Sequence, residues 1–184
     1  MIGVGASNPE LHPLLRNRWS PRVWDASHVI TDAQVASILE AARWAPSAGN
    51  SQPWSFVVAQ RGDANHQRIL PHLAASSGAW APDASLLIVN VCHRFVEGTD
   101  WDYSEFAEYD LGQAVAHMTL QAQSIGMAVR QFRAFDLEQL TEEFEIPEHW
   151  RILTIAAFGV PLATSIEQHE AASRDRRRRG DLLW

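Results

Sequence analysis

The sequence Ser85-Leu-Leu-Ile-Val-Asn-Val-Cys92 carries the clearest strand pattern in the chain. Its nearly continuous apolar run does not alternate with polar residues, which is typical of a strand covered on both faces of a sheet. Shorter strand patterns occur at Trp54–Ala59 and Ile152–Phe158. Together the three segments predict a mixed sheet with helices on its faces.

Helical patterns would supply the layers that such a sheet needs. Thr31 and Gln34 have the spacing of a capping box, so a helix is expected to begin there and to end before Pro46. An apolar stripe over residues 111–125 predicts a long helix that Gly126 stops. Shorter helices are expected at residues 9–18, 62–76 and 137–144.

The segment 93–108 is expected to be a loop or lid, because it is polar and aromatic without regular periodicity. Trp101, Tyr103 and Phe106 in this segment, together with Phe132, are candidate walls for a planar substrate, although the buried core is the commoner place for aromatic residues. The sequence has no internal repeat and no linker of biased composition. A length of 184 residues therefore favours a single domain over residues 1–184.

The charged residues exclude several classes of function. A net charge of −7 argues against general nucleic-acid binding, which requires an excess of cations. All 15 residues counted as Lys or Arg are arginine, which rules out a Schiff-base lysine, a P-loop lysine and a lysine general base. Anions must therefore be bound by arginine side chains or by backbone N–H groups.

Cysteine usage and hydropathy bear on the compartment. Cys92 is the single cysteine, so no disulfide within the chain is possible and a reducing compartment is expected. Its place at the end of a buried strand predicts an inert thiol, although His93 follows it directly. The eight histidines show no metal-binding spacing. The sequence has neither a membrane-spanning apolar run nor a signal-peptide pattern, so we expect a cytoplasmic protein without membrane partners.

Arg18-x-Ser20-x-Arg22 is the first stretch that suggests chemistry. Pro21 keeps the segment out of a helix, and in an extended chain alternate side chains point to the same side. The two guanidinium groups and the hydroxyl would then form one patch, suited to a phosphate or to the electron-rich edge of a heterocycle. A solvated basic edge explains the same pattern.

Ala45-Pro-Ser-Ala-Gly-Asn-Ser-Gln-Pro-Trp54 is the second such stretch, and it lies between a predicted helix and a predicted strand. Loops at such junctions line ligand crevices in layered sheets. Asn50 and Gln52 offer paired donors and acceptors of the kind that read a planar, amide-like edge. The alternative is a turn stiffened by its two prolines.

A run of arginines, Arg176–Arg179, is the third stretch. A solvated tail or a nucleic-acid patch would each explain it. The acidic residues close to it and the acidic balance of the chain argue against a polyanion as its partner.

Together these segments resemble the nitroreductase family. Residues 18–24 are similar to its opening pattern R-x-S-x-R/K-x-F, and residues 45–54 match its most distinctive signature nearly letter for letter. The further similar segments are Tyr109-Asp-Leu-Gly-Gln-Ala, Gln131-Phe-Arg-Ala-Phe-Asp136, the stretch 146–159 and the closing arginines. The resemblance covers residues 11–184 in the right order.

The resemblance implies an α+β fold, a three-layer sandwich whose mixed, mainly antiparallel central sheet is flanked by helices, in an intertwined homodimer. It also implies that FMN binds non-covalently at the dimer interface, in two sites to which both chains contribute. Flavin N5 would carry the chemistry in a ping-pong reaction that passes electrons from NADH or NADPH to a small planar acceptor. No side chain is then expected to be an obligatory acid or base.

By match, the opening segment would hold one side of the FMN. Arg18 and Ser20 would contact the phosphate and ribityl region, and Trp19 between them is counted among the cofactor-binding residues. Arg22 would lie near N1 and O2 of the pyrimidine end. A cation there stabilises the negative charge of reduced flavin and raises its potential.

The loop between the predicted helix and strand would reach the flavin held by the partner chain. By match, Pro46, Ser47 and Asn50 would approach that flavin, and Gln52 would support the loop.

Two later segments complete the implied site. The backbone at Arg133 and Ala134 would lie beside N5 and O4, and Ala134 stands where the family commonly has glycine, so the backbone there would pass the ring less closely or with another dihedral. Arg177 and Arg179, or the arginines one position away, would bind the phosphate. The segment 93–108 is short for a lid, a departure that bears on the substrate more than on the flavin.

Three functions follow from the resemblance. The first is an FMN-dependent NAD(P)H oxidoreductase that acts on nitroaromatics, quinones or related acceptors. The second is a different flavin reaction on the same fold, of the dehalogenase, flavin-destroying or dehydrogenase type. The third is a non-catalytic FMN-binding or sensor protein.

Overall fold

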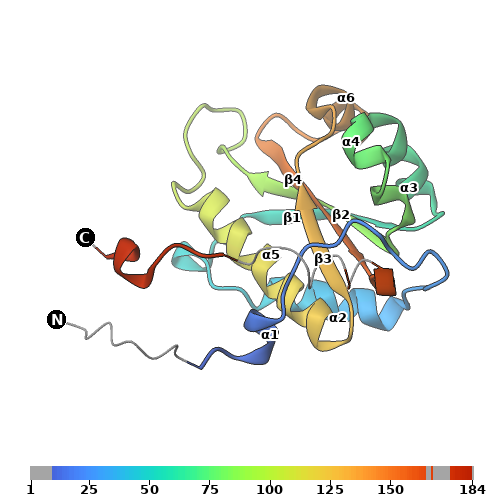
Figure 1. Ribbon diagram of the computed structural model, residues 1–184. Coiled ribbons are helices and arrows are strands. Elements are labelled where there is room, and N and C mark those ends of the chain that lie inside the picture. The colour runs from blue at the N-terminus through green and yellow to red at the C-terminus, as the bar shows by residue number, and fades with distance from the viewer. Residues whose placement is uncertain (1–9, 165–166, 168–174, 184) are drawn as a thin grey trace.

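The computed structural model, which describes residues 10–164, 167 and 175–183, contains a sheet between two layers of helices (Figure 1). The strands are β1 (Trp54–Gln60), β2 (Leu86–His93), β3 (Ala128–Phe132) and β4 (Trp150–Gly159). Their order across the sheet is β1-β2-β4-β3, and each pairing of these four strands is antiparallel. The predicted α+β sandwich with a mainly antiparallel sheet is therefore confirmed.

The strand β2 is buried on both faces, as its apolar sequence predicts. Leu86 and Ile88 pack in the core on one side of the sheet, whereas Leu87 and Val89 pack in the core on the other side. Full burial of such a side chain contributes about 1.5–3 kcal/mol. Two separate helix layers are therefore needed to keep this one strand out of water.

The first layer consists of α2 (Asp32–Arg43) and α5 (Ala107–Ser124), with the short α1 (Pro13–Arg16) against α5. The predicted capping box begins α2: the Thr31 hydroxyl accepts from the Gln34 N–H at 3.2 Å, and the Gln34 side chain accepts from the Thr31 N–H at 2.9 Å. The helix predicted over residues 9–18 is shorter than expected, because only Pro13–Arg16 is helical.

Among the described residues, no helix combines the length and hydropathy that crossing a bilayer demands.

The second layer consists of α3, α4 and α6, which cover the opposite face of the sheet (Figure 1). Their bounds are Ala64–Ile69 for α3, Ala75–Gly78 for α4 and Leu137–Glu143 for α6. The prediction of one helix over residues 62–76 is wrong. Pro71 cannot donate the backbone hydrogen bond that an α-helix requires, so a 3₁₀ turn, Leu70–His72, follows α3. Leu73 is then extended and forms an isolated bridge with Phe135.

The strand β3 is not predicted by the sequence pattern. It is short, and it places Arg130 towards one face of the sheet and Gln131 towards the other, so no apolar alternation marks it. Its position at the edge of the sheet explains why it can carry polar side chains on both faces. Gly126 ends α5 as expected, with a φ of 84° that a residue with a side chain rarely adopts.

The segment 93–108 forms a hairpin-like loop and then the first residues of α5, which begins before the predicted position 111. Phe95 and Asp102 form an isolated antiparallel bridge, and Arg94 pairs with Asp102 at 3.2 Å. Gly98, with a φ of 72°, lies in the turn between them. The loop is therefore closed by its own backbone and ion-pair contacts.

A side chain at Gly159 is expected to destabilise the fold. A Cβ there would lie 2.9 Å from Cε3 of Trp24 and 3.4 Å from the backbone nitrogen of Ser85. Because Trp24 is buried, Gly159→Ala should lower the free energy of unfolding by about 1–3 kcal/mol. At Gly78 the nearest atom would be 3.9 Å away, so Gly78→Ala should change this free energy by less than about 0.5 kcal/mol. Urea denaturation of both variants measures the difference, and equal effects would contradict the packing argument.

Candidate functional site

Arg18 and Ser20 lie together at one pocket, as the spacing of the opening segment predicts. The pocket has a volume of about 360 Å³. Arg18 Nη1 lies 3.4 Å from Ser20 Oγ, to which it donates a hydrogen bond. The remaining lining comes from α1, α5 and β3: Leu15, Ala116, Thr119, Leu120, Val129 and Gln131. The pocket therefore combines a cationic, hydroxyl-bearing end with apolar walls.

The chain around this pocket is extended because the sheet edge and a proline hold it. Pro21 is buried, and the Ser20 carbonyl accepts a hydrogen bond from Arg130 Nη1 at 2.8 Å. Further along, Trp24 forms an isolated bridge with Pro161. Arg22 is exposed and does not line the pocket, so the structure brings together two of the three side chains that the pattern groups.

Trp19 borders a second hollow, of about 210 Å³, beside the first. Thr119 and Val129 line both hollows, so the two share a wall formed by α5 and β3. Trp19 is half-buried and belongs to the same extended segment as Arg18 and Ser20. The opening segment thus contributes three neighbouring residues to one hollowed surface.

The turn after β3 is anchored to the α3–α4 region. The Ala134 carbonyl accepts hydrogen bonds from the Ala74 N–H, at 3.1 Å, and from the Ser77 hydroxyl. The Arg133 guanidinium lies over the Phe135 ring, 5.2 Å from its centroid. The peptide between residues 134 and 135 is therefore held by its carbonyl oxygen, and the Arg133 side chain is exposed.

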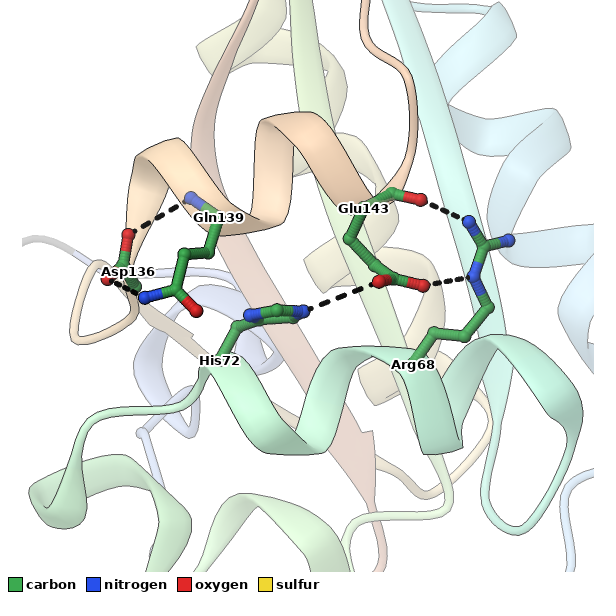
Figure 2. Close-up of polar contacts among 5 residues, drawn as sticks. All are labelled: Arg68, His72, Asp136, Gln139 and Glu143. Atoms are coloured by element: carbon green, nitrogen blue, oxygen red, sulfur yellow. Dashed lines mark hydrogen bonds and ion pairs between the residues drawn. The ribbon is translucent and has the colours of Figure 1, made fainter.

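Polar contacts extend this anchor to α6 (Figure 2). The Asp136 carboxylate caps α6 by accepting from the Gln139 N–H at 3.1 Å. Arg68 of α3 pairs with Glu143 at the other end of α6, at 2.7 Å, and His72 lies 3.8 Å from the same carboxylate. The hydrogen bond from Arg68 holds the pKa of Glu143 below its usual value. These contacts stabilise the layer that supports residues 133–136.

The loop between α2 and β1 has an unusual backbone. Gly49, Asn50 and Gln52 have φ values of 59°, 56° and 47°, in the left-handed region. Asparagine tolerates this region, whereas a glutamine there is less common. Ser47 Oγ accepts from the Gln52 N–H at 3.0 Å, and Gln52 Nε2 donates to the Asn50 carbonyl at 3.3 Å. Gln52 is therefore hydrogen-bonded to two other residues of the loop.

A buried carboxylate holds the same loop against α5. Asp110 is 2% exposed, and its Oδ2 accepts from the Ala48 N–H at 2.9 Å. Gln113 donates to the other Asp110 oxygen at 3.3 Å and to the Pro46 carbonyl at 3.5 Å. The family resemblance includes this part of α5 but predicts no role for Asp110. An acidic residue in the first turn of a long helix was the available signal.

The hairpin-like loop also contacts this region. Tyr103 Oη donates to the Ser51 carbonyl at 3.2 Å, and the Tyr103 ring stacks on His93 with centroids 3.8 Å apart. His93 stacks in turn on Trp150 at 4.5 Å. Burial is the main cause that lowers the pKa of His93. An imidazole stacked between two aromatic rings indicates a packing role.

Cys92, which precedes this stack, is unreactive by its surroundings. It is fully buried, and burial raises the pKa of its thiol to about 11. Within the described ranges no group of three or more His, Cys, Asp or Glu side chains could hold a metal ion.

The residues predicted for one site form separate groups on a single chain. Asp110, which anchors the loop 46–53, and Thr119, which lines the first pocket, are nine positions apart on α5, or about 14 Å along its axis. Arg177 and Arg179 are exposed, in a segment that projects beyond α5 (Figure 1). Neither of them lines the two hollows beside Arg18.

This chain is similar in sequence to proteins of the nitroreductase family. A sequence profile of the nitroreductase family matches residues 15–90. A protein of Archaeoglobus fulgidus, provisionally named NADH dehydrogenase/NAD(P)H nitroreductase, is 30% identical over 154 residues, which are 80% of this chain and 83% of that protein.

Two solved structures share the fold over nearly the whole chain. A crystal structure of an FMN-containing oxidoreductase is 26% identical, with a TM-score of 0.85 over 97% of this chain and 92% of that one. An FMN complex of a provisionally named nitroreductase from Desulfovibrio desulfuricans is 25% identical, with a TM-score of 0.74 over 95% of this chain and 96% of that one.

Asp110→Ala is expected to release the loop 46–53. The Ala48 N–H would lose its hydrogen bond to a charged, buried acceptor, which should lower the free energy of unfolding by about 1–3 kcal/mol. Limited proteolysis should also cleave the loop faster. Glu108→Ala is the matched control, because Glu108 is exposed and lies 3.7 Å from Arg151, so its loss should cost less than about 1 kcal/mol. Equal proteolysis of the two variants would remove Asp110 from this role.

Proposed function

Since this chain belongs to the nitroreductase family, we propose that it is an FMN-dependent oxidoreductase that passes electrons from NADH or NADPH to a nitroaromatic, quinone or related acceptor. The observation that carries the proposal is the pocket in which Arg18 and Ser20 form a polar end against apolar walls. The FMN-containing oxidoreductase with the similar fold supports the choice of cofactor. A reducing, cytoplasmic setting suits the single buried thiol of Cys92.

The residues around the pocket fit the parts of FMN. A guanidinium group and a hydroxyl, from Arg18 and Ser20, suit a phosphate and its ribityl chain. Ala116, Leu120 and Val129 offer apolar surface of the kind that covers an aromatic ring system. We assign Trp19 to the same binding surface.

The pyrimidine end of the ring would lie towards Arg22 and the turn after β3. Arg22 would offer a cation beside N1 and O2, and the backbone at Arg133 and Ala134 would face N5 and O4. The Ala134 carbonyl already has two donors on the core side, which supports a fixed peptide at that position.

The chemistry that bound FMN supplies is two-electron transfer, with the nucleotide and the acceptor occupying the site in turn. The chain's own contribution is to bind the cofactor, to orient it and to limit the access of water. The unreactive Cys92 and the stacked His93 are consistent with a reaction that needs no protein acid or base.

We propose that the active form is a homodimer with FMN at the interface. The loop that bears Pro46, Ser47, Asn50 and Gln52 lies towards the start of α5, about 14 Å from the pocket wall at Thr119. A second copy packed with its α5 in the opposite direction would bring this loop to the pocket of the first.

The exposed surface of α5 supports this assembly. Tyr109, Gly112 and Ala116 lie on one side of the helix and are exposed, and Phe106 just before it is 47% exposed. Gly112 and Ala116 are small enough to let another helix approach closely.

The C-terminal segment supports it as well. Residues 175–183 are exposed throughout and include Leu182 and Leu183, at 65% and 58% exposure. Burial of these leucines under a partner chain would stabilise a dimer. Arg177 and Arg179 on the same segment would then reach a phosphate at the interface.

The function is tested by reduction of the purified, FMN-loaded protein under anaerobic conditions. NADH or NADPH should bleach its yellow colour, and a nitroaromatic or a quinone should restore it. A protein that binds FMN but is bleached by neither nucleotide would contradict the oxidoreductase proposal and favour the sensor function. Bleaching without recovery on any acceptor would favour a different flavin reaction.

Removing residues 174–184 is expected to lower both FMN retention and dimer stability. If Arg177 or Arg179 makes one charge-assisted hydrogen bond to phosphate, the deletion should weaken FMN binding by at least about 1.5–3 kcal/mol. Fluorescence titration with FMN and analytical ultracentrifugation measure the two effects.

The double variant Leu182→Ser/Leu183→Ser is the matched control for the deletion. It keeps the arginines and removes only apolar surface, so it should weaken the dimer more than it weakens phosphate binding. If the truncated protein binds FMN with unchanged affinity and remains a dimer of unchanged stability, the segment takes part neither in FMN binding nor in dimer formation.

A further inference from the structure

Arg130 lies on the face of β3 opposite to the pocket. Its neighbours Val129 and Gln131 line that pocket, and alternate side chains of a strand point to opposite faces. The Arg130 guanidinium lies over the ring of Trp80, 5.2 Å from its centroid, on the side of the sheet that α3, α4 and α6 cover. None of the sequence patterns assigned Arg130 to a site.

The guanidinium nevertheless reaches the cofactor segment. Arg130 Nη1 donates to the Ser20 carbonyl at 2.8 Å, across 110 positions of sequence. Arg130 Nε is buried and has no hydrogen-bond partner among the residues that the structure describes. Ser20 is the central residue of Arg18-x-Ser20-x-Arg22, so Arg130 fixes the backbone between the two arginines of that pattern.

Among the described residues, no carboxylate pairs with Arg130. The stretches 14–24 and 126–135 contain five arginines and neither Asp nor Glu, in a chain of net charge −7. In the part of the chain that the structure describes, Arg22 likewise forms no ion pair. Burial, and after it the charge of Arg22, lower the pKa of Arg130.

We propose that Arg130 is a positioning residue of the FMN site that also acts electrostatically: it fixes the Ser20 carbonyl and adds a second positive charge behind Arg22, so that the site favours reduced, anionic flavin over oxidised flavin. The inference rests on the function proposed above. Arg130 would then influence the reduction potential of FMN although it does not line the pocket.

Bringing two guanidinium groups together costs free energy. A partly buried guanidinium without a carboxylate loses hydration, and a second guanidinium in electrostatic range adds repulsion. A negative charge that arrives near both offsets these two costs. Because the added charge of reduced flavin spreads over N1 and O2, the end assigned to Arg22 is where the offset is largest.

The test compares the FMN-loaded full chain with Arg130→Gln and Arg130→Lys. Arg130→Gln removes the charge, so the preference for reduced over oxidised FMN should fall about tenfold, which is a midpoint potential about 30 mV more negative for a two-electron couple. Arg130→Lys keeps the charge and should recover most of that potential. A spectroelectrochemical titration gives each value, and thermal unfolding of each variant without FMN reports its folding.

Arg61→Gln is the matched control. Arg61 also donates to backbone carbonyls, those of Asp83 at 2.9 Å and His28 at 2.7 Å, but it follows β1, at the opposite side of the sheet from β3. Arg61→Gln changes the net charge of the chain by the same amount as Arg130→Gln. The midpoint potential of FMN bound to Arg61→Gln should stay at the wild-type value.

The outcomes separate the inference from the proposed function. Wild-type potentials in both Arg130 variants, with FMN bound, would overturn the inference and leave the FMN-dependent function standing. The same negative shift in Arg61→Gln would also overturn it, because the effect would then be one of net charge alone. A wild-type chain that binds no FMN would overturn both. If Arg130→Gln does not fold, Arg130→Met takes its place as the variant without the charge. A wild-type potential in both Arg130→Met and Arg130→Lys would then overturn the inference.

Discussion

The burial of β2 on both faces is the constraint on which the rest of the structure depends. A strand with apolar side chains in both directions requires a helix layer on each side, and β4 beside it has the same requirement. β1 and β3 are consequently left at the edges of the sheet. Polar side chains are tolerated at an edge, and β3 accordingly carries Arg130 on one face and Gln131 on the other.

The sequence predicts the buried parts of the fold better than its edges. The apolar run of β2 and the capping box at Thr31 are local signals, and both agree with the structure. β3 escapes prediction because Arg130 and Gln131 obscure any alternation. The break at Pro71 could have been predicted, since proline has no backbone N–H to donate to a helix.

The site residues show a similar division between identity and placement. The family resemblance supplies the identities of Arg18, Ser20 and the residues of the loop 46–53, but neither spacing nor composition tells which of them share a pocket in one chain. The hydrogen bond from the Ala48 N–H to Asp110 spans 62 positions, and that from Arg130 to Ser20 spans 110. Contacts of this kind arise from the packing of α5 and β3, so no local sequence pattern predicts them.

The arginines beside the pocket have one more consequence. Guanidinium groups stay protonated under conditions in which an ammonium group begins to lose its charge, and they are not substrates of the enzymes that acetylate lysine. With no lysine anywhere in the sequence, the positive potential of this surface is out of reach of that common covalent regulation. Control of the protein by the cell would have to act through its abundance, through its small-molecule supply or through chemistry at other side chains.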